Sequence, residues 1–254
     1  MNSQARAADF GRERIDAAEW QVRVELAAIY RLLHHYGWDE LIYNHAAARV
    51  PGEPDKFLIK KHDMLYDEVT ASNLAKVGMG GQLDERHGVN KPGFMLHSGI
   101  LMARPDVHCS IHIHAAAAAA VSALPSGLRM VSQAALRFYG RIGYHAFEGI
   151  ADGAEERRRI ARDLGDNRVL FLRYHGVVSV GAHCTQAINT LRHLMTACEI
   201  QMLVEASQQA TPDIPAGICA ETAQQVAAGE QRRGNDEMPA YMRLLDRIDP
   251  GYRD

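Results

Sequence analysis

The chain has 254 residues, of which 47% are hydrophobic and 23% are charged, which is the composition of an ordinary globular protein. Its 28 Lys and Arg residues and 31 Asp and Glu residues give a formal net charge of −3, which does not indicate a nucleic-acid partner. No stretch approaches the ~20 apolar residues of a membrane span and the N-terminal segment shows no secretion signal, so we expect a cytoplasmic protein with no membrane partner.

The first predicted element is a helix that begins after Asp16. Asp16 and Glu19 form a capping-box pattern, and apolar residues then recur at helical spacing from Val22 to Leu33. Gly37 is typical of the residue that follows a helix C-terminus. The sequence therefore predicts an amphipathic helix between Asp16 and Gly37.

The elements that follow are read from apolar periodicity, turn residues and prolines. In chain order we predict two strands over 42–52 and 56–61, then a short helix and a hairpin around Gly80–Gly81 within 65–85. A helix over 94–104, a strand over 108–114 and an alanine-rich helix over 115–124 follow, and the signals over 129–150 are mixed. The last predicted elements are a helix over 153–165, two strands over 169–181, and a long helix from Thr185, its predicted N-cap, to 209. Without a repeat or a linker, strands and helices predict one α/β domain over 1–254, with a core at about 16–206 and a C-terminal tail over 211–254 that wraps the surface or reaches a neighbouring subunit.

The strand over 108–114 carries three of the thirteen histidines, and thirteen is a high number for this length. Side chains alternate along a strand, so His112 and His114 point to the same face as His108 and Ser110. Their Cα atoms are expected about 6–7 Å apart, which suits two ligands that converge on one ion. A His-x-His pair alone is more often a solvated strand face, and this alternative stays open at this point.

A third ligand would have to come from another strand end, and His175 is the outstanding candidate. It lies at the predicted turn between the two strands of 169–181, where Gly176 allows a sharp turn that aims the ring. Three histidines from two strand ends are a reasonable ligand set for a divalent metal ion.

Four stretches together resemble the class II aldolase/adducin family: GWDELIYNHAAARV, LYDEVTASNLAKV, GFMLHSGILMARPDVHCSIHIHA and FLRYHGVVSVG. The similarity runs in order from about Leu26 to Val204. It implies a three-layer α/β/α sandwich with a mostly antiparallel central sheet, usually assembled as a homotetramer. It also implies one zinc or another divalent ion per chain, bound by three histidines that fall on His112, His114 and His175. Three protein ligands leave an open coordination position, as in catalytic zinc sites.

The chain departs from the family pattern at the catalytic base. The family glutamate four residues before His97 is replaced by Gly93, and the serine pair of the phosphate pocket is replaced by Lys91 and Pro92. Asn44 keeps an identity of the substrate loop and is the candidate substrate-binding residue. An imidazole can exchange protons near neutral pH, so His97 is the candidate catalytic residue, and helix packing or ligand support is the alternative role.

These observations predict a metal-dependent carbon–carbon lyase that acts on a small, non-phosphorylated hydroxy- or keto-carboxylate. Decarboxylation gives a metal-stabilised enolate without a base, whereas retro-aldol cleavage needs His97 in place of the missing glutamate. The alternative is a non-catalytic, adducin-like metal-binding scaffold. The family's tyrosine proton donor has four candidates that the sequence does not rank: Tyr139, Tyr144, Tyr241 and Tyr252.

Overall fold

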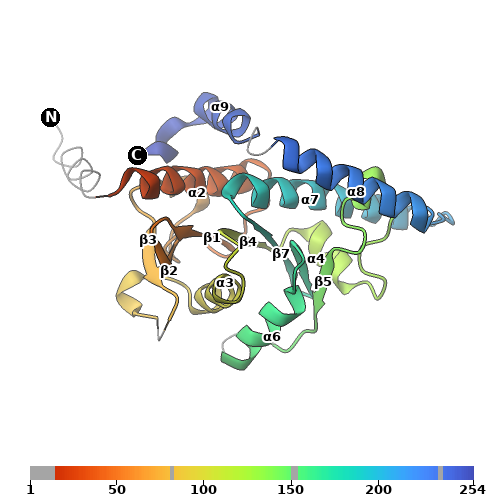
Figure 1. Cartoon of the computed structure of the whole chain (residues 1–254), viewed down its shortest axis with the longest axis horizontal. Coiled ribbons are helices and arrows are strands. Elements are labelled where there is room, and N and C mark those ends of the chain that lie inside the picture. Colours follow the sequence, from red (N-terminus) through yellow and green to blue (C-terminus); the bar gives the residue numbers. More distant parts are fainter. Residues whose placement is uncertain (1–14, 81–82, 150–153, 234–236) are drawn as a thin grey trace.

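The computed structural model describes residues 15–80, 83–149, 154–233 and 237–254. A seven-stranded sheet forms the central layer, with α2 and α7 on one face and α3 and α6 on the other (Figure 1). Neighbouring strands are antiparallel except for β5 and β6. The predicted α/β sandwich with a mostly antiparallel central sheet is therefore confirmed.

The strands are β1 (His45–Val50), β2 (Glu53–Ile59), β3 (Ala75–Gly78), β4 (Cys109–Ile113), β5 (Ile142–His145), β6 (Val169–Leu172) and β7 (Gly176–Gly181). The α-helices are α2 (Ala17–His35), α3 (Lys91–Ala103), α4 (Ala116–Ala123), α5 (Gln133–Leu136), α6 (Ala154–Leu164), α7 (Cys184–Ala206), α8 (Ala216–Arg233) and α9 (Met238–Ile248). Three 3₁₀ turns lie within the described ranges: η1 (Tyr66–Glu68), η2 (Glu85–His87) and η3 (Pro250–Arg253). Within those ranges, no helix is both long enough and apolar enough to cross a membrane.

The order of the strands, β3-β2-β1-β4-β7-β6-β5, brings several histidines together at one end of the strands. His45 of β1 pairs with His112 of β4, and His112 also pairs with Val178 of β7. Farther along the sheet, His145 of β5 pairs with Leu172 of β6. Residues paired in register share a face of a sheet, so this register places His45 beside His112.

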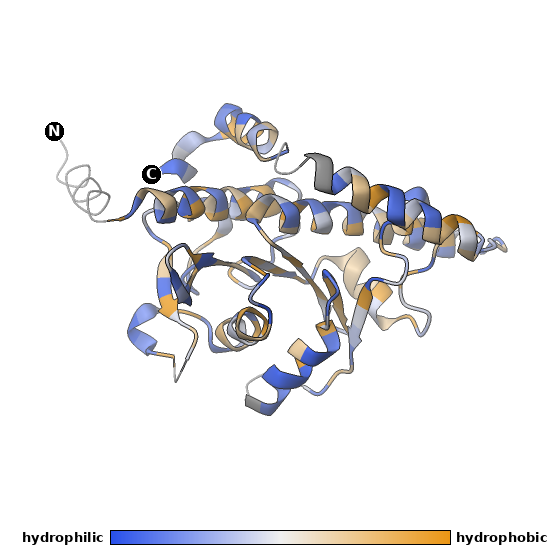
Figure 2. Cartoon of the chain, viewed as in Figure 1, coloured by the Kyte–Doolittle hydropathy of each residue, from blue (hydrophilic) through white to orange (hydrophobic). Residues whose placement is uncertain are grey.

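Alternation along β4 separates the core from the histidine face. Cys109, Ile111 and Ile113 are fully buried in the hydrophobic cluster that includes residues of α2 and α7. Ser110 and His112 point to the other face, where Ser110 Oγ is hydrogen-bonded to His97 of α3. Figure 2 shows that hydrophobic residues concentrate in the central strands, whereas α6 is largely hydrophilic. The polar face of β4 is therefore covered by helices rather than by solvent.

Tyr30 of α2 fastens the helix layer to the sheet. Its fully buried hydroxyl donates to the Ala46 carbonyl (2.5 Å) and accepts from the backbone N–H groups of Ala46 (2.9 Å) and Lys60 (3.3 Å).

Tyr30→Phe should lower the free energy of unfolding by about 1–3 kcal/mol, because buried backbone groups lose their partner. Denaturant titration beside Tyr36→Phe tests this, since the Tyr36 hydroxyl makes no hydrogen bond in the described residues. Equal stability of the two variants would contradict the prediction.

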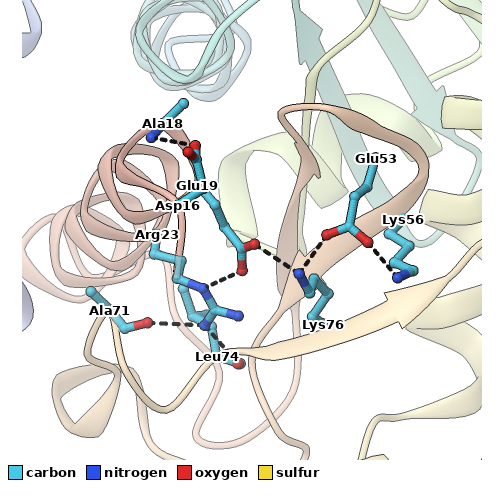
Figure 3. A network of polar contacts seen from close by, with 9 residues as sticks. All are labelled: Asp16, Ala18, Glu19, Arg23, Glu53, Lys56, Ala71, Leu74 and Lys76. Atoms are coloured by element: carbon cyan, nitrogen blue, oxygen red, sulfur yellow. Dashed lines mark hydrogen bonds and ion pairs between the residues drawn. The ribbon is translucent and has the colours of Figure 1, made fainter. Parts of the chain in front are cut away.

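An ion-pair network, buried at Glu19 and Arg23, joins α2 to the outer strands of the sheet (Figure 3). Glu19 is 5% exposed and accepts from Arg23 (2.8 Å) and from Lys76 of β3 (2.7 Å). Lys76 also reaches Glu53 of β2, and Arg23 donates to the carbonyls of two residues that precede β3. The predicted N-cap of this helix is confirmed, since Asp16 accepts from the Ala18 N–H. Glu19, which the capping-box pattern directs back to the helix start, bonds to these cations instead.

The N-cap of α7 differs from the prediction. His183, rather than Thr185, caps the helix: its backbone is extended and its Nδ1 accepts from the Gln186 N–H at 3.1 Å. The predicted cap is two residues too late because an imidazole nitrogen can take the role usually given to a hydroxyl or a carboxylate. Part of the predicted hairpin, Gly81, lies outside the described residues.

The segment after Thr211 contains α8, α9 and η3. Tyr252 is fully buried, and its carbonyl accepts from the Ala71 N–H at 3.1 Å. The Asp254 carbonyl accepts from the Ser72 N–H at 2.8 Å. The end of the described chain therefore packs beside α2, on the face of the sheet opposite to α3 and α6 (Figure 1). The organisation of 1–254 as one domain stays a prediction.

Candidate active site

The structure brings together the three histidines that the motifs single out. His112 lies on β4, His114 directly follows this strand, and His175 lies in the turn between β6 and β7. Their ring centroids are 4.5–4.9 Å apart, and one ring nitrogen from each lies within 4.8 Å of the others. The Nε2 atoms of His112 and His114 are 2.9 Å apart. Three imidazoles from two strand ends therefore converge on one point.

The outer hydrogen bonds of these rings fit a metal site. His112 Nδ1 donates to the Val177 carbonyl (3.1 Å), and His114 Nδ1 donates to the Glu40 carboxylate (2.6 Å). Because both partners are acceptors, both rings present the Nε2 lone pair to the centre. Two lone pairs at 2.9 Å repel each other unless a proton or a cation lies between them. A divalent ion that both rings coordinate removes this repulsion, so the residues present fit such an ion.

Burial keeps the rings of His112 and His175 neutral. Burial, followed by the charges of the neighbouring histidines, holds the pKa of His112 well below its usual range. Burial likewise lowers the pKa of His175 to about 4. At neutral pH these rings are therefore in the unprotonated form that can bind a metal ion.

The histidine cluster opens onto a cavity of about 390 Å³ between this end of the strands, α3 and α6. Apolar side chains such as Leu96 and Ile160 form part of its wall, and Tyr43 and Tyr174 lie at exposed positions of its rim. This volume and the mixed lining suit a small molecule with a few polar groups.

Asn44, the predicted substrate-binding residue, lines the same cavity. It is 3% exposed, and both amide atoms are buried without a hydrogen-bond partner in the described structure. Its backbone is left-handed (φ +63°), which Asn tolerates better than most residues. A buried amide without a partner costs about 1–3 kcal/mol, which is a reason to expect a ligand there.

The structure places His97, the predicted catalytic residue, behind the cavity wall. His97 is fully buried on α3 and does not line the cavity. Its Nδ1 meets Ser110 Oγ (3.0 Å), and its Nε2 meets Nδ1 of His45 (2.8 Å). Burial lowers the pKa of His97 to about 3. His45, in contrast, lines the cavity, so the imidazole that reaches the site is His45.

Gly93 explains why His45 can lie there. A Cβ atom at Gly93 would be 2.6 Å from His45 Cδ2 and 2.8 Å from His45 Nε2, closer than real contacts allow. The ring of His45 therefore occupies the space that any side chain at Gly93 would need. Sequence reasoning missed His45 because only the β1–β4 register shows that it faces His112, at a ring distance of 5.2 Å.

The four tyrosines considered as proton donors do not line the cavity of the described chain. Tyr241 bonds to Asn189, and Tyr252 bonds to Asp246. The tyrosines that do line it, Tyr43 and Tyr174, lie next to Asn44 and His175 in sequence. That adjacency is the signal from which they could have been chosen.

Comparison with known proteins agrees with this geometry. The family model "Class II Aldolase and Adducin N-terminal domain" matches residues 24–202. Alpha-adducin of Rattus norvegicus is 41% identical over 260 residues, which cover 94% of this chain and 34% of the adducin, so the match spans about a third of that protein. The structure of an aldolase II superfamily protein from Pseudomonas syringae is similar with a TM-score of 0.87 and 40% identity, over 96% of this chain and 99% of that one. The structure of L-fuculose 1-phosphate aldolase from Glaciozyma antarctica PI12 gives a TM-score of 0.81 and 25% identity, over 98% and 99%. The chain therefore belongs to the class II aldolase/adducin family, as its motifs predict.

Proposed function

We propose that the protein is a zinc-dependent carbon–carbon lyase that acts on a small, non-phosphorylated hydroxy- or keto-carboxylate. The observation that carries the proposal is the convergence of His112, His114 and His175 on one wall of a cavity of about 390 Å³. A bound divalent ion would supply Lewis acidity toward the negative charge that develops on a substrate oxygen as the carbon–carbon bond breaks. We further propose one ion per chain at this site and a homotetramer in the cytoplasm.

His45 takes the acid–base role that the sequence assigned to His97. Burial and the neighbouring His97 hold the pKa of His45 well below its usual range, so the ring is neutral at neutral pH. Its Nδ1 is bonded to His97, which leaves Nε2 as the atom for proton transfer. In a retro-aldol cleavage, Nε2 takes the substrate hydroxyl proton and returns it to the product carbon. In a decarboxylation, CO₂ leaves and the carbon takes one proton that comes from solvent through His45. His97 and Ser110 then act as positioning residues, since they orient His45 through its Nδ1.

The cavity lining supports a substrate without a phosphate group. Among its described residues, Arg173 alone carries a permanent positive charge, and its guanidinium donates to the carbonyls of Ser122 and Leu124 and lies over the Tyr144 ring. Lys60 is also engaged, since four backbone carbonyls lie within hydrogen-bond distance of its ammonium and accept its three N–H groups. Among the described residues, a phosphate dianion would therefore find no side-chain cation in the cavity that is free to bind it, whereas one carboxylate can be held at the metal position.

The experiment is to load the protein with zinc and assay a panel of hydroxy- and keto-carboxylates beside fuculose 1-phosphate. We expect turnover of a member of the carboxylate panel that is lost on chelation and restored by zinc, with feeble cleavage of the sugar phosphate. Brisk cleavage of fuculose 1-phosphate would contradict the inference from Gly93.

A second candidate function is a non-catalytic, adducin-like scaffold, which the 41% identity to alpha-adducin favours. Zinc binding without turnover of any panel member would support it. Sedimentation tests the tetramer separately, and a monomer at micromolar concentration would exclude that part of the proposal.

Substitution of Asn44 by glycine separates binding from stability. Glycine removes the unpaired amide and accepts the left-handed backbone, so the ligand-free protein should be as stable or up to about 1 kcal/mol more stable. KM for the substrate should rise while the zinc content stays the same. Thermal unfolding of the ligand-free protein is the measurement, and a marked loss of stability would show that the amide has a structural role instead.

A further inference from the structure

A second group of potential metal ligands lies in the same cavity, apart from the three histidines. His145 ends β5, Glu148 follows it in the adjoining loop, and Glu156 lies in the first turn of α6. One ring nitrogen of His145 and one carboxylate oxygen from each glutamate lie within 4.8 Å of one another. β5 is two strands from β7, which at ~4.8 Å per strand puts the two backbones roughly 10 Å apart. The cavity therefore has two distinct sets of potential ligands.

His145 itself points to a ligand. Its side chain is buried, with 4% of the residue exposed, and Nδ1 is bonded to the Asp163 carboxylate at 2.7 Å. The carboxylate is an acceptor, so Nδ1 carries the proton and Nε2 presents a lone pair. Nε2 is buried and has no hydrogen-bond partner in the described structure. An acceptor left in this way costs about 1–3 kcal/mol, and an imidazole held by a carboxylate on its other nitrogen is the usual arrangement of a metal-binding histidine.

The two glutamates leave negative charge beside this nitrogen. Arg159 donates to both oxygens of Glu148, and each oxygen keeps a further lone pair. Glu156 makes no ion pair within the described residues. One guanidinium against two carboxylates leaves the group with a net negative charge. The ligand that complements a neutral nitrogen and two carboxylates is therefore a cation.

We propose that His145, Glu148 and Glu156 bind a second divalent metal ion. One imidazole nitrogen with carboxylate oxygens suits a first-row ion such as Mn²⁺ or Zn²⁺. The ion links the residues directly after β5 and the first turn of α6 to the end of β5. It also places a second positive charge in the cavity, which an oxygen-rich molecule can bind. This inference does not rest on the proposed lyase activity, because it concerns binding by other residues.

The test uses the full chain with His112 and His114 replaced by alanine, so that binding at the first site is removed. Mn²⁺ alone is titrated into this protein, and free Mn²⁺ is followed by its electron paramagnetic resonance signal. We expect one Mn²⁺ per chain. Adding Glu156→Gln should weaken Mn²⁺ binding more than about 100-fold, because it removes a metal ligand. Loss of a residue that only hydrogen-bonds to a ligand already lowers metal affinity about 10–100-fold.

Glu155→Gln is the matched control. It removes the same charge one residue earlier on α6, where Glu155 is exposed and paired with Arg158 rather than turned to the cavity. The control should bind Mn²⁺ as its parent does. His145→Gln should also lose binding, and far-ultraviolet circular dichroism will show whether this variant still folds. Absence of Mn²⁺ binding in the parent, or equal binding by the Glu155 and Glu156 variants, would overturn the second site and leave the triple-histidine site untouched.

Discussion

Replacement of both His112 and His114 by alanine is expected to abolish zinc binding at the triple-histidine site and to remove all metal-dependent activity. Two of the three converging nitrogens are lost, and a single imidazole cannot hold zinc against dilution. The variant should also lose the stabilisation that a bound ion gives the folded state, which is about 4 kcal/mol when the free ion is at 1,000 times its dissociation constant. Zinc per chain by mass spectrometry and the melting temperature with and without chelator measure both effects.

The control for this variant replaces His34 and His35, which lie exposed at the end of α2. It removes the same number of imidazoles from the protein without touching the cavity, so its zinc content and its response to chelator should match the wild type. Unchanged zinc in the His112 and His114 variant would place the metal elsewhere. A chelator-dependent melting temperature that survives in that variant, with no zinc present, would instead point to the His145 group.

Gly93→Ala is expected to reduce turnover by about 10²–10⁴-fold, which is the usual contribution of an acid–base group. The new methyl carbon would meet the His45 ring at 2.6 Å, and the neighbour that must move is an imidazole held by His97. The ring would be displaced from its hydrogen bond with His97, so kcat should fall more than KM. Zinc content should not change, because Gly93 lies outside the triple-histidine cluster. Steady-state kinetics on the best substrate of the carboxylate panel are the measurement.

A helical glycine elsewhere supplies the comparison. Gly217 of α8 has no atom within 4 Å of a Cβ placed on it, so Gly217→Ala should leave turnover and zinc unchanged. His45→Gln should lose as much turnover as Gly93→Ala, and combining the two should add little, since both act through one ring. Full activity in His45→Gln would show that a group other than His45 carries out the acid–base step. We also expect Gly93→Glu alone not to create a sugar-phosphate aldolase, because the His45 ring fills the space that the glutamate would need.

Much of the sheet and one part of the site follow from local patterns. Alternation in 108–114 predicts which side chains of β4 reach the core, and the His-x-His pair with the later His-Gly turn predicts the convergence of His112, His114 and His175. These signals are strong because each depends on residues one or two positions apart. β5, in contrast, is only four residues long, and nothing in its own sequence marks it as a strand.

The rest of the site depends on relations across the sheet. His45 and Gly93 are far apart in sequence, and only the pairing of β1 with β4 and the packing of α3 bring them into one space. The motif places His97 near the site in sequence, yet in the structure the ring of His45 lies between His97 and the cavity. His145, Glu148 and Glu156 become neighbours only because β5 pairs in parallel with β6 and α6 returns over the same face. The spacing of residues along the chain therefore does not predict these contacts.

The position of residues 252–254 bears on where a linker can be attached. The carbonyls of Tyr252 and Asp254 accept hydrogen bonds from backbone N–H groups beside α2. The cavity, in contrast, opens between the end of the strands, α3 and α6. A peptide fused after Asp254 starts on the opposite side of the sheet and keeps the Asp254 carbonyl as an acceptor. A linker attached there can anchor the protein to a sensor surface or a bead while small molecules and metal ions still reach both groups of ligands.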